Sequence, residues 1–167
     1  VYGKGMESLV GIKEVWTNEF VPHFISSFKN SKVIIVVRDP RAITSSNYAT
    51  QEHRYPFLFL GRQWRKLSVL GDMYNSRYDN VYLLKYEDLI KEPKTITRNL
   101  CGFLEIDFDD SLIDHKKFID GAGQTWLQNS SYNQVKRGFN KDFLNKWKKV
   151  LNEKQVSFIE GLCFFDV

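Results

Sequence analysis

The residue run Val33-Ile34-Ile35-Val36-Val37 constrains the fold of this 167-residue chain more than any other feature. All five side chains are β-branched, and no polar residue alternates with them. β-Branched residues favour extended backbone, and an apolar run without alternation is typical of a strand buried on both faces. The run therefore predicts a central strand of a parallel sheet flanked by helices, which places the chain in the α/β class.

Apolar spacing on either side of this run predicts further elements. Upstream, residues 21–28 have near-helical spacing and Leu9-Val10-Gly11-Ile12 favours a shorter strand, so the order is that of a βαβ unit. Downstream, Asp39 is typical of a helix cap, and this helix is predicted to reach about Ala49. The remaining predicted elements are a helix over 57–78, a strand over 81–86, a turn after Asp88, a helix over 96–104, a helix over about 143–151, and a last helix from Glu153 to about Leu162, capped by Asn152 with Gln155.

Length and charge limit the classes of function. The chain shows no linker or repeat and is long enough for one core, so it is predicted to be a single domain over 1–167. Its net charge of +4 permits an anionic small ligand but is too small for a polybasic nucleic-acid arm. No window of roughly 18 apolar residues predicts a membrane-spanning helix. Two cysteines imply no disulfide scaffold and suit a reducing compartment.

Arg38 directly follows the predicted buried strand. Ligands of open parallel sheets bind at the carboxyl ends of the strands, and a guanidinium there can hold a phosphate with two charge-assisted hydrogen bonds. Ser46, eight residues later, can reach the same anion if the intervening helix leans over the site. The alternative is that Arg38 pairs with Asp39 or with a C-terminal carboxylate and that Ser46 is a surface serine.

Three blocks of sequence, in this order, resemble motifs of the PAPS-dependent sulfotransferases, where PAPS is 3′-phosphoadenosine 5′-phosphosulfate. Residues 33–48, with Arg38-Asp39-Pro40-Arg41-Ala42 and Ser46, are similar to the 3′-phosphate-binding motif of the family. The second block is 82–89, followed by Pro93 and 100–104, and the third holds 129–132, 136–138, 147–151 and Gln155. The resemblance covers roughly Gly11 to Cys163 and is nearest to the bacterial and carbohydrate-type branch. It implies a partial, P-loop-like sulfotransferase fold.

The resemblance also implies roles for individual residues. Arg38 and Ser46 would hold the 3′-phosphate of the nucleotide, and Tyr86 would lie near its adenine. The late basic loop that closes over the same phosphate would be Lys136, Arg137 and Gly138. The alternatives are a core aromatic for Tyr86 and a solvated charge pair for Lys136 and Arg137.

The family's loop for the 5′-phosphosulfate has no convincing counterpart in this sequence. The segment 3–8 contains two glycines and a lysine, but no predicted strand precedes it. We therefore expect the chain to be the C-terminal part of a sulfotransferase domain, inactive by itself. Lys13 matches a family lysine on the strand before Arg38, here predicted over 11–16, and the adjacent Glu14 is the candidate general base. His53 is the candidate acceptor-binding residue.

The implied reaction moves a sulfuryl group from PAPS to a hydroxyl or amine and leaves PAP, the 3′,5′-bisphosphate. The expected acceptor is a carbohydrate or another small molecule, and neither a metal nor a nucleic acid is expected to take part. The alternative function is a non-catalytic domain that binds PAP, another nucleotide or a glycan. The bacterial-type motifs imply a cytoplasmic location, whereas an animal carbohydrate-type protein would lie in the Golgi lumen.

Overall fold

The computed structural model describes residues 10–46, 55–119, 123 and 138–163. Strands β1 (Val33–Val37) and β2 (Val81–Lys85) form a parallel sheet of two strands, with Val33 opposite Val81 and Val37 opposite Lys85. Parallel strands need a crossover connection, which here contains the helices α2 (Pro40–Thr44) and α3 (Phe57–Arg77). The predicted α/β class and parallel sheet are confirmed.

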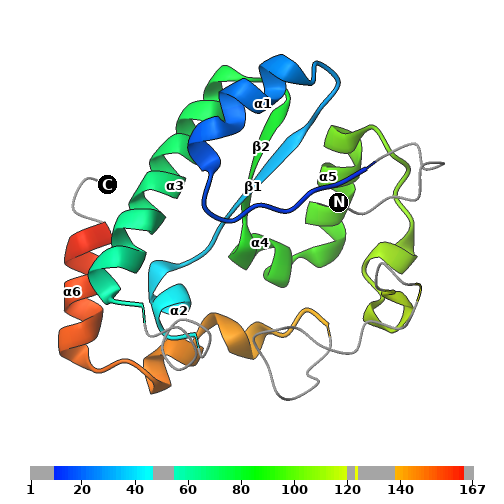
Figure 1. Cartoon of the computed structure of the whole chain (residues 1–167). Helices are drawn as coiled ribbons and strands as arrows, with labels where there is room; N and C mark the ends of the chain where they lie inside the picture. Colours follow the sequence, from blue (N-terminus) through cyan, green and yellow to red (C-terminus); the bar gives the residue numbers. More distant parts are fainter. Residues whose placement is uncertain (1–9, 47–54, 120–122, 124–137, 164–167) are drawn as a thin grey trace.

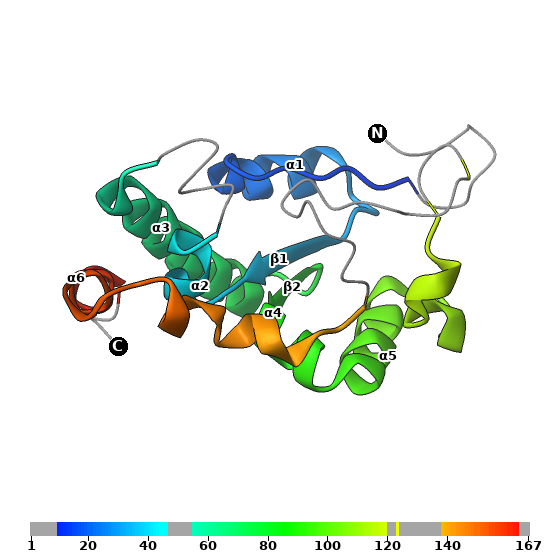
Figure 2. The same ribbon diagram turned by 90° about the horizontal axis from the view of Figure 1, so that it is seen from below.

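The other helices are arranged around these strands. Before β1 come η1 (Asn18–Phe20) and α1 (Val21–Ser27). After β2 come α4 (Tyr86–Lys91), α5 (Pro93–Leu104), the short 3-10 helices η3 (Asp110–Leu112), η4 (His115–Lys117), η5 (Lys141–Leu144) and η6 (Lys146–Lys149), and finally α6 (Glu153–Cys163). Viewed from below, α1 lies on one side of the strands and the η5–η6 segment on the other (Figure 2).

Both strands run in the same direction, and their carboxyl ends lead straight into α2 and α4 (Figure 1). Helix α2 contacts η6, and α4 contacts η5, so the η5–η6 segment lies against this end of the sheet. The carboxyl ends of β1 and β2 therefore lead into short helices and turns. This is the place where open parallel sheets bind ligands.

Two hydrophobic clusters hold the described residues together. The first joins the sheet to α3 through Ile35, Tyr74 and Val81. The second joins α3 to α6 and is built on Leu151, Ile159 and Cys163, with Phe57 and Trp64 packed against them. Helix α3 belongs to both clusters, and its length of 21 residues lets it connect the sheet with the C-terminal helix.

The cap predicted for the last helix is present. The Asn152 carboxamide accepts from the Gln155 backbone N–H at 3.0 Å, and the Gln155 side chain accepts from the Asn152 N–H at 3.0 Å. Asp39 likewise caps α2, because its Oδ1 accepts from the Arg41 backbone N–H at 2.8 Å. These caps satisfy backbone donors that a helix start leaves unpaired, which is why both helices begin where the sequence predicts.

The structure corrects four predictions about strands. Residues 10–12 and 11–16 form no strand, and Val10, Ile12 and Val15 are 58%, 59% and 54% exposed. The βαβ unit with a strand over 9–12 is therefore wrong for its described part. β1 is not buried on both faces either, because Val36 is 47% exposed. Among the described residues β1 pairs only with β2, so it is not a central strand here.

The predicted helix boundaries also change in places. α2 ends at Thr44 rather than near Ala49, because the Thr44 hydroxyl donates back to the Pro40 carbonyl and the Ser45 hydroxyl to the Ala42 carbonyl. The turn predicted between Asp88 and Pro93 is shorter than expected, because α4 continues to Lys91 and the chain leaves helical geometry only at Glu92, at φ −132° and ψ 59°. The helix predicted over about 143–151 is replaced by η5 and η6, because Asn145 between them leaves helical geometry at φ −111° and ψ 9°.

Candidate functional site

Arg38 and Tyr86 face each other just beyond the carboxyl ends of the paired strands. The Arg38 guanidinium lies over the Tyr86 ring, 4.5 Å from its centroid. One residue further on, the Asp39 backbone N–H donates to the Glu87 carboxylate at 3.0 Å. The pairing of Val37 with Lys85 thus continues past the strand ends, through side chains instead of a backbone ladder.

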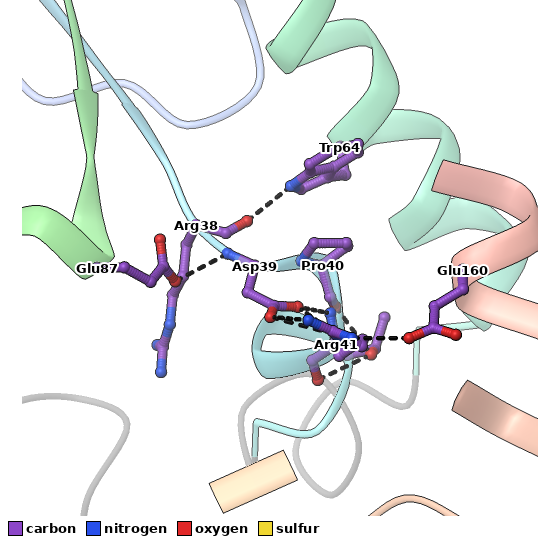
Figure 3. Close-up of polar contacts among 8 residues, drawn as sticks. Arg38, Asp39, Pro40, Arg41, Trp64, Glu87 and Glu160 are labelled. Atoms are coloured by element: carbon purple, nitrogen blue, oxygen red, sulfur yellow. Dashed lines mark hydrogen bonds and ion pairs between the residues drawn. The ribbon is translucent and has the colours of Figure 1, made fainter. Parts of the chain in front are cut away.

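The Arg38 side chain has spare hydrogen-bonding capacity. Its Nη2 donates to the Phe143 carbonyl over a long 3.5 Å, and its Nε is buried without a hydrogen-bond partner among the described residues. A buried charged donor without an acceptor is unfavourable, so a site of this kind suits an anion that supplies the missing acceptor atoms. Figure 3 shows the Arg38 side chain extending away from the ion pairs of Arg41.

The carboxylate next to Arg38 in sequence belongs to a different pair. Asp39 accepts from Arg41 Nε at 3.0 Å and from Arg41 Nη2 at 2.7 Å, and Arg41 Nη1 donates to Glu160 of α6 at 2.7 Å (Figure 3). The same guanidinium lies 4.2 Å from the centroid of the Trp147 ring. The hydrogen bonds that Arg41 donates to Asp39, and to a smaller extent the one that it donates to Glu160, raise the pKa of Arg41. Arg41 therefore neutralises Asp39, so Asp39 is not the ion-pair partner of Arg38 and Arg38 can bind a different anion.

Trp64 is a contact of Arg38 that sequence reasoning missed. Its indole Nε1 on α3 donates to the Arg38 carbonyl oxygen at 2.6 Å (Figure 3). Glu87 and Glu160 were missed as well. Trp64 and Glu160 are separated by 26 and 119 residues from the groups they bind, so no local pattern identifies them.

An open hollow of about 540 Å³ lies beside these residues. It is bounded by α2, α4 and the η5–η6 segment, and its lining residues are Asp39, Arg41, Glu87, Lys91, Leu144, Asn145, Trp147 and Lys148. Lys91 and Lys148 are exposed cations on its two sides. Charged side chains of both signs line the hollow together with Leu144 and Trp147, and Arg38 is not among the lining residues.

Ser46 and Gly138 are the other described members of the predicted nucleotide site. Ser46 lies beyond the end of α2, half-buried, and its backbone N–H donates to the Ile43 carbonyl at 3.1 Å. Gly138 has a φ of +90°, and a Cβ there would lie 3.0 Å from Nδ1 of His115, so glycine suits this position sterically. Lys136, Arg137 and His53 lie outside the described residues.

Lys13 and Glu14 lie on the exposed segment that precedes η1, which is not the strand predicted for them. The Glu14 carboxylate accepts from the backbone N–H groups of Val15 at 2.8 Å and Trp16 at 3.0 Å. These bonds, that of Trp16 first, lower the pKa of Glu14. A lowered pKa makes Glu14 a weaker proton acceptor but keeps it ionised at neutral pH.

The described residues contain no group of three or more His, Cys, Asp or Glu side chains placed to hold a metal ion. Within the same part of the chain, none of the helices combines the length and apolar character needed to cross a membrane.

The chain is similar to sulfotransferases in sequence and in fold. A family model described as a sulfotransferase domain matches residues 17–163. A putative protein-tyrosine sulfotransferase of Caenorhabditis briggsae is 24% identical over 162 residues, covering 92% of this chain and 57% of that protein. A putative protein-tyrosine sulfotransferase of Caenorhabditis elegans is also 24% identical, with 92% and 61% covered. This chain thus spans about three fifths of the length of these relatives.

A solved structure shares the fold. The crystal structure of a mouse sulfotransferase complexed with PAP superposes with a TM-score of 0.61 at 20% identity, covering 90% of this chain and 64% of the other. At this level of identity the match establishes the arrangement of helices and strands and leaves the site to be argued from the residues themselves.

Proposed function

The chain belongs to the sulfotransferase family, and from this premise we propose that its protein transfers a sulfuryl group from PAPS to a hydroxyl or amine acceptor. The observation that carries the proposal is the Arg38 guanidinium at the carboxyl end of β1. Its buried Nε has no acceptor among the described residues, and Tyr86 supports its face. A nucleotide phosphate supplies the acceptor oxygens that such a group needs.

The residues fit a 3′-phosphorylated nucleotide. Arg38 would hold the 3′-phosphate, Ser46 would add a hydroxyl donor, and Lys136, Arg137 and Gly138 would close over the same phosphate, as the family resemblance implies. The bound PAPS supplies the activated sulfuryl group itself. The part of the reaction that this chain contributes is to bind and orient the nucleotide at its phosphate end.

The acceptor is proposed by chemical class only. The motif resemblance favours a carbohydrate or small-molecule hydroxyl, whereas two relatives carry the name protein-tyrosine sulfotransferase, which favours a phenolic hydroxyl of a protein. Incubating the full-length protein with labelled PAPS and three acceptors, namely an oligosaccharide, a simple phenol and a tyrosine peptide, separates these choices. The acceptor that takes up label at the lowest concentration identifies the class.

We propose Lys13 and Glu14 as the catalytic residues, with Glu14 as the general base, and His53 as the residue that binds the acceptor. Glu14 is a carboxylate that stays ionised at neutral pH, which a general base requires. We also propose the cytoplasm as the location, with the Golgi lumen as the alternative, and cell fractionation of the full-length protein distinguishes the two.

Calorimetry of nucleotide binding tests the proposed function most directly. The full-length protein is titrated with PAP and, as a control, with 5′-AMP, which lacks the 3′-phosphate. Tight PAP binding with weak 5′-AMP binding supports the proposal, whereas equal affinities reject the 3′-phosphate site. PAP binding without sulfuryl transfer to any acceptor would instead support the non-catalytic nucleotide-binding function.

A further inference from the structure

We propose that Trp64 and Glu87 are positioning residues that fix the direction in which Arg38 leaves β1. Both act on one peptide group, the one that joins Arg38 to Asp39. The inference rests on the proposed function, because it assigns Trp64 and Glu87 to the geometry of the same phosphate site. Trp64 lies outside the three motif blocks of the sequence, and Glu87 lies inside the second block but received no role there.

Trp64 and Glu87 form hydrogen bonds with opposite sides of the same peptide group. Trp64 Nε1 donates to the Arg38 carbonyl oxygen at 2.6 Å, and Glu87 Oε1 accepts from the Asp39 N–H at 3.0 Å (Figure 3). The carbonyl and N–H of a trans peptide point in opposite directions. One partner therefore comes from α3 and the other from α4, and together they prevent rotation of the peptide plane.

Among the described residues, the backbone ladder of the sheet does not reach this peptide. β1 ends at Val37, so the backbone ladder with β2 stops one residue before Arg38. The two contacts fix the carbonyl side of the Arg38 Cα. If they are lost, the segment can turn about the N–Cα bond of Arg38, and this change in φ swings the long Arg38 side chain away from its place over Tyr86. Binding sites lose affinity when a key group is displaced by about an ångström.

Partial burial strengthens the two hydrogen bonds that hold the Arg38–Asp39 peptide. Arg38, Asp39 and Glu87 are all half-buried, and a hydrogen bond to a carboxylate gains strength where water is partly excluded. Trp64 is itself anchored, because its ring packs against the hydrophobic cluster that joins α3 to α6. The Arg38–Asp39 peptide is therefore attached to the rigid part of the fold rather than to a loop.

The negative charge of Glu87 allows an experiment to distinguish a positioning role from a purely electrostatic one. Glu87 is an anion next to a proposed phosphate site, so removing its charge should tighten phosphate binding if the residue acts only through its electrostatic field. If Glu87 positions Arg38, removing its hydrogen-bond acceptor should weaken phosphate binding despite the lost charge. Glu87→Met removes the acceptor at nearly constant length, and Glu87→Gln removes the charge but keeps an oxygen that accepts from Asp39.

The experiment measures the affinity ratio of PAP to 5′-AMP in the full-length protein. Glu87→Met is expected to reduce this ratio about tenfold, which is the effect of one hydrogen bond of about 1.4 kcal/mol. Glu87→Gln should restore the ratio to within about threefold of the wild type. Trp64→Phe, which keeps the aromatic packing but lacks the indole N–H, should also reduce it by about tenfold. Asp88→Asn, on the exposed side of α4, removes a neighbouring charge as a control.

The outcomes separate this inference from the proposed function. A wild-type protein that binds PAP no better than 5′-AMP rejects the phosphate site itself. If the wild type prefers PAP to 5′-AMP, and Glu87→Met and Trp64→Phe keep the same affinity ratio, only the positioning role is overturned. If Glu87→Met fails to fold, Trp64→Phe decides by the same ratio. Weaker affinity for both nucleotides alike also overturns the inference, because it indicates a general loss of structure.

Discussion

The Arg38 guanidinium lies 4.5 Å from the centroid of the Tyr86 ring, and each residue directly follows the last residue of its strand. The register of the parallel pair, with Val37 opposite Lys85, is what brings them together. A shift of one residue would turn the Tyr86 ring toward the other face of the sheet. Two sequence motifs separated by nearly fifty residues therefore form one site because of a strand pairing.

Replacing Arg38 by alanine tests the phosphate-binding group. Arg38→Ala is expected to weaken PAP binding by about 1.5–3 kcal/mol, the usual contribution of hydrogen bonds to a charged group. Binding of 5′-AMP should be unchanged, because that nucleotide has no 3′-phosphate for Arg38 to hold. Isothermal calorimetry measures both affinities, and unchanged PAP affinity in a folded variant rejects Arg38 as the phosphate ligand.

The ring of Tyr86 should contribute through its face rather than its hydroxyl. Tyr86→Leu removes the aromatic face below the Arg38 guanidinium and is expected to weaken PAP binding by about 0.5–2 kcal/mol. Tyr86→Phe keeps the face and is the matched control, which should bind nearly as well as the wild type. Equal losses in both variants would assign the effect to the hydroxyl and contradict the stacking role.

The close packing of α3 on α6 depends on glycine at position 61. A Cβ at Gly61 would collide with the Leu162 side chain, so Gly61→Ala is expected to destabilise the fold by about 1–3 kcal/mol. Gly161→Ala is the control on α6, where a Cβ meets open space, and alanine should stabilise the helix by about 0.5–1 kcal/mol. Urea unfolding measures both changes, and equal effects of the two substitutions would contradict this packing.

The ion pairs of Arg41 should differ in strength because their exposure differs. The Asp39 side chain is 18% exposed and that of Glu160 is 42% exposed. Glu160→Gln is therefore expected to cost less than about 1 kcal/mol, since solvent screens the pair. Arg41→Met removes both pairs and the stack on Trp147, and is expected to cost about 2–3 kcal/mol.

Urea unfolding at neutral pH also checks these two variants. Lys94→Met is the control, because its pair with Asp110 is 53% and 69% exposed and should contribute almost nothing. A Glu160→Gln loss as large as that of Arg41→Met would show that the bridge to α6, rather than Asp39, dominates the cluster.

The pH dependence of activity tests Glu14 as the base. Hydrogen bonds from Trp16 and Val15 lower its pKa below the ordinary 4.5, so the carboxylate stays ionised, and able to accept a proton, down to lower pH. The acid limb of kcat/KM should lie below pH 4.5, and Glu14→Gln should lower kcat by about 10²-fold or more. The hydrogen bonds that lower the pKa of Glu14 also stabilise the folded protein. This stabilisation is present above the pKa that Glu14 has in the unfolded chain, and it is lost as the pH falls through its pKa in the folded protein.

Steady-state rates of the full-length protein provide the measurement for Glu14. Glu19→Gln is the matched control, because Glu19 lies nearby and forms an ion pair with Lys66 at 3.1 Å. A Glu14→Gln variant that retains the wild-type rate assigns the base to another residue.

Local patterns in the sequence determined much of this protein. The β-branched run specified β1, the capping residues specified where α2 and α6 begin, and the position of Arg38 after the strand specified which residue meets a ligand at the sheet edge. These features were predictable because strand propensity and helix caps act over a few residues. The motifs around Arg38 and Tyr86 also sufficed to identify the family.

Tertiary structure alone decided which residues surround Arg38. Trp64, Glu87 and Glu160 reach the segment 38–41 from three helices far along the chain, and their partners follow from the register of the sheet and the packing of α3 against α6. The exposed face of Val36 and the break of helix at Asn145 were equally invisible, since burial and helix ends depend on what packs nearby. The sequence identifies Arg38 as the phosphate-binding candidate, whereas long-range contacts set the direction of its side chain. Local periodicity reports only on residues a few positions apart, so it cannot predict those contacts.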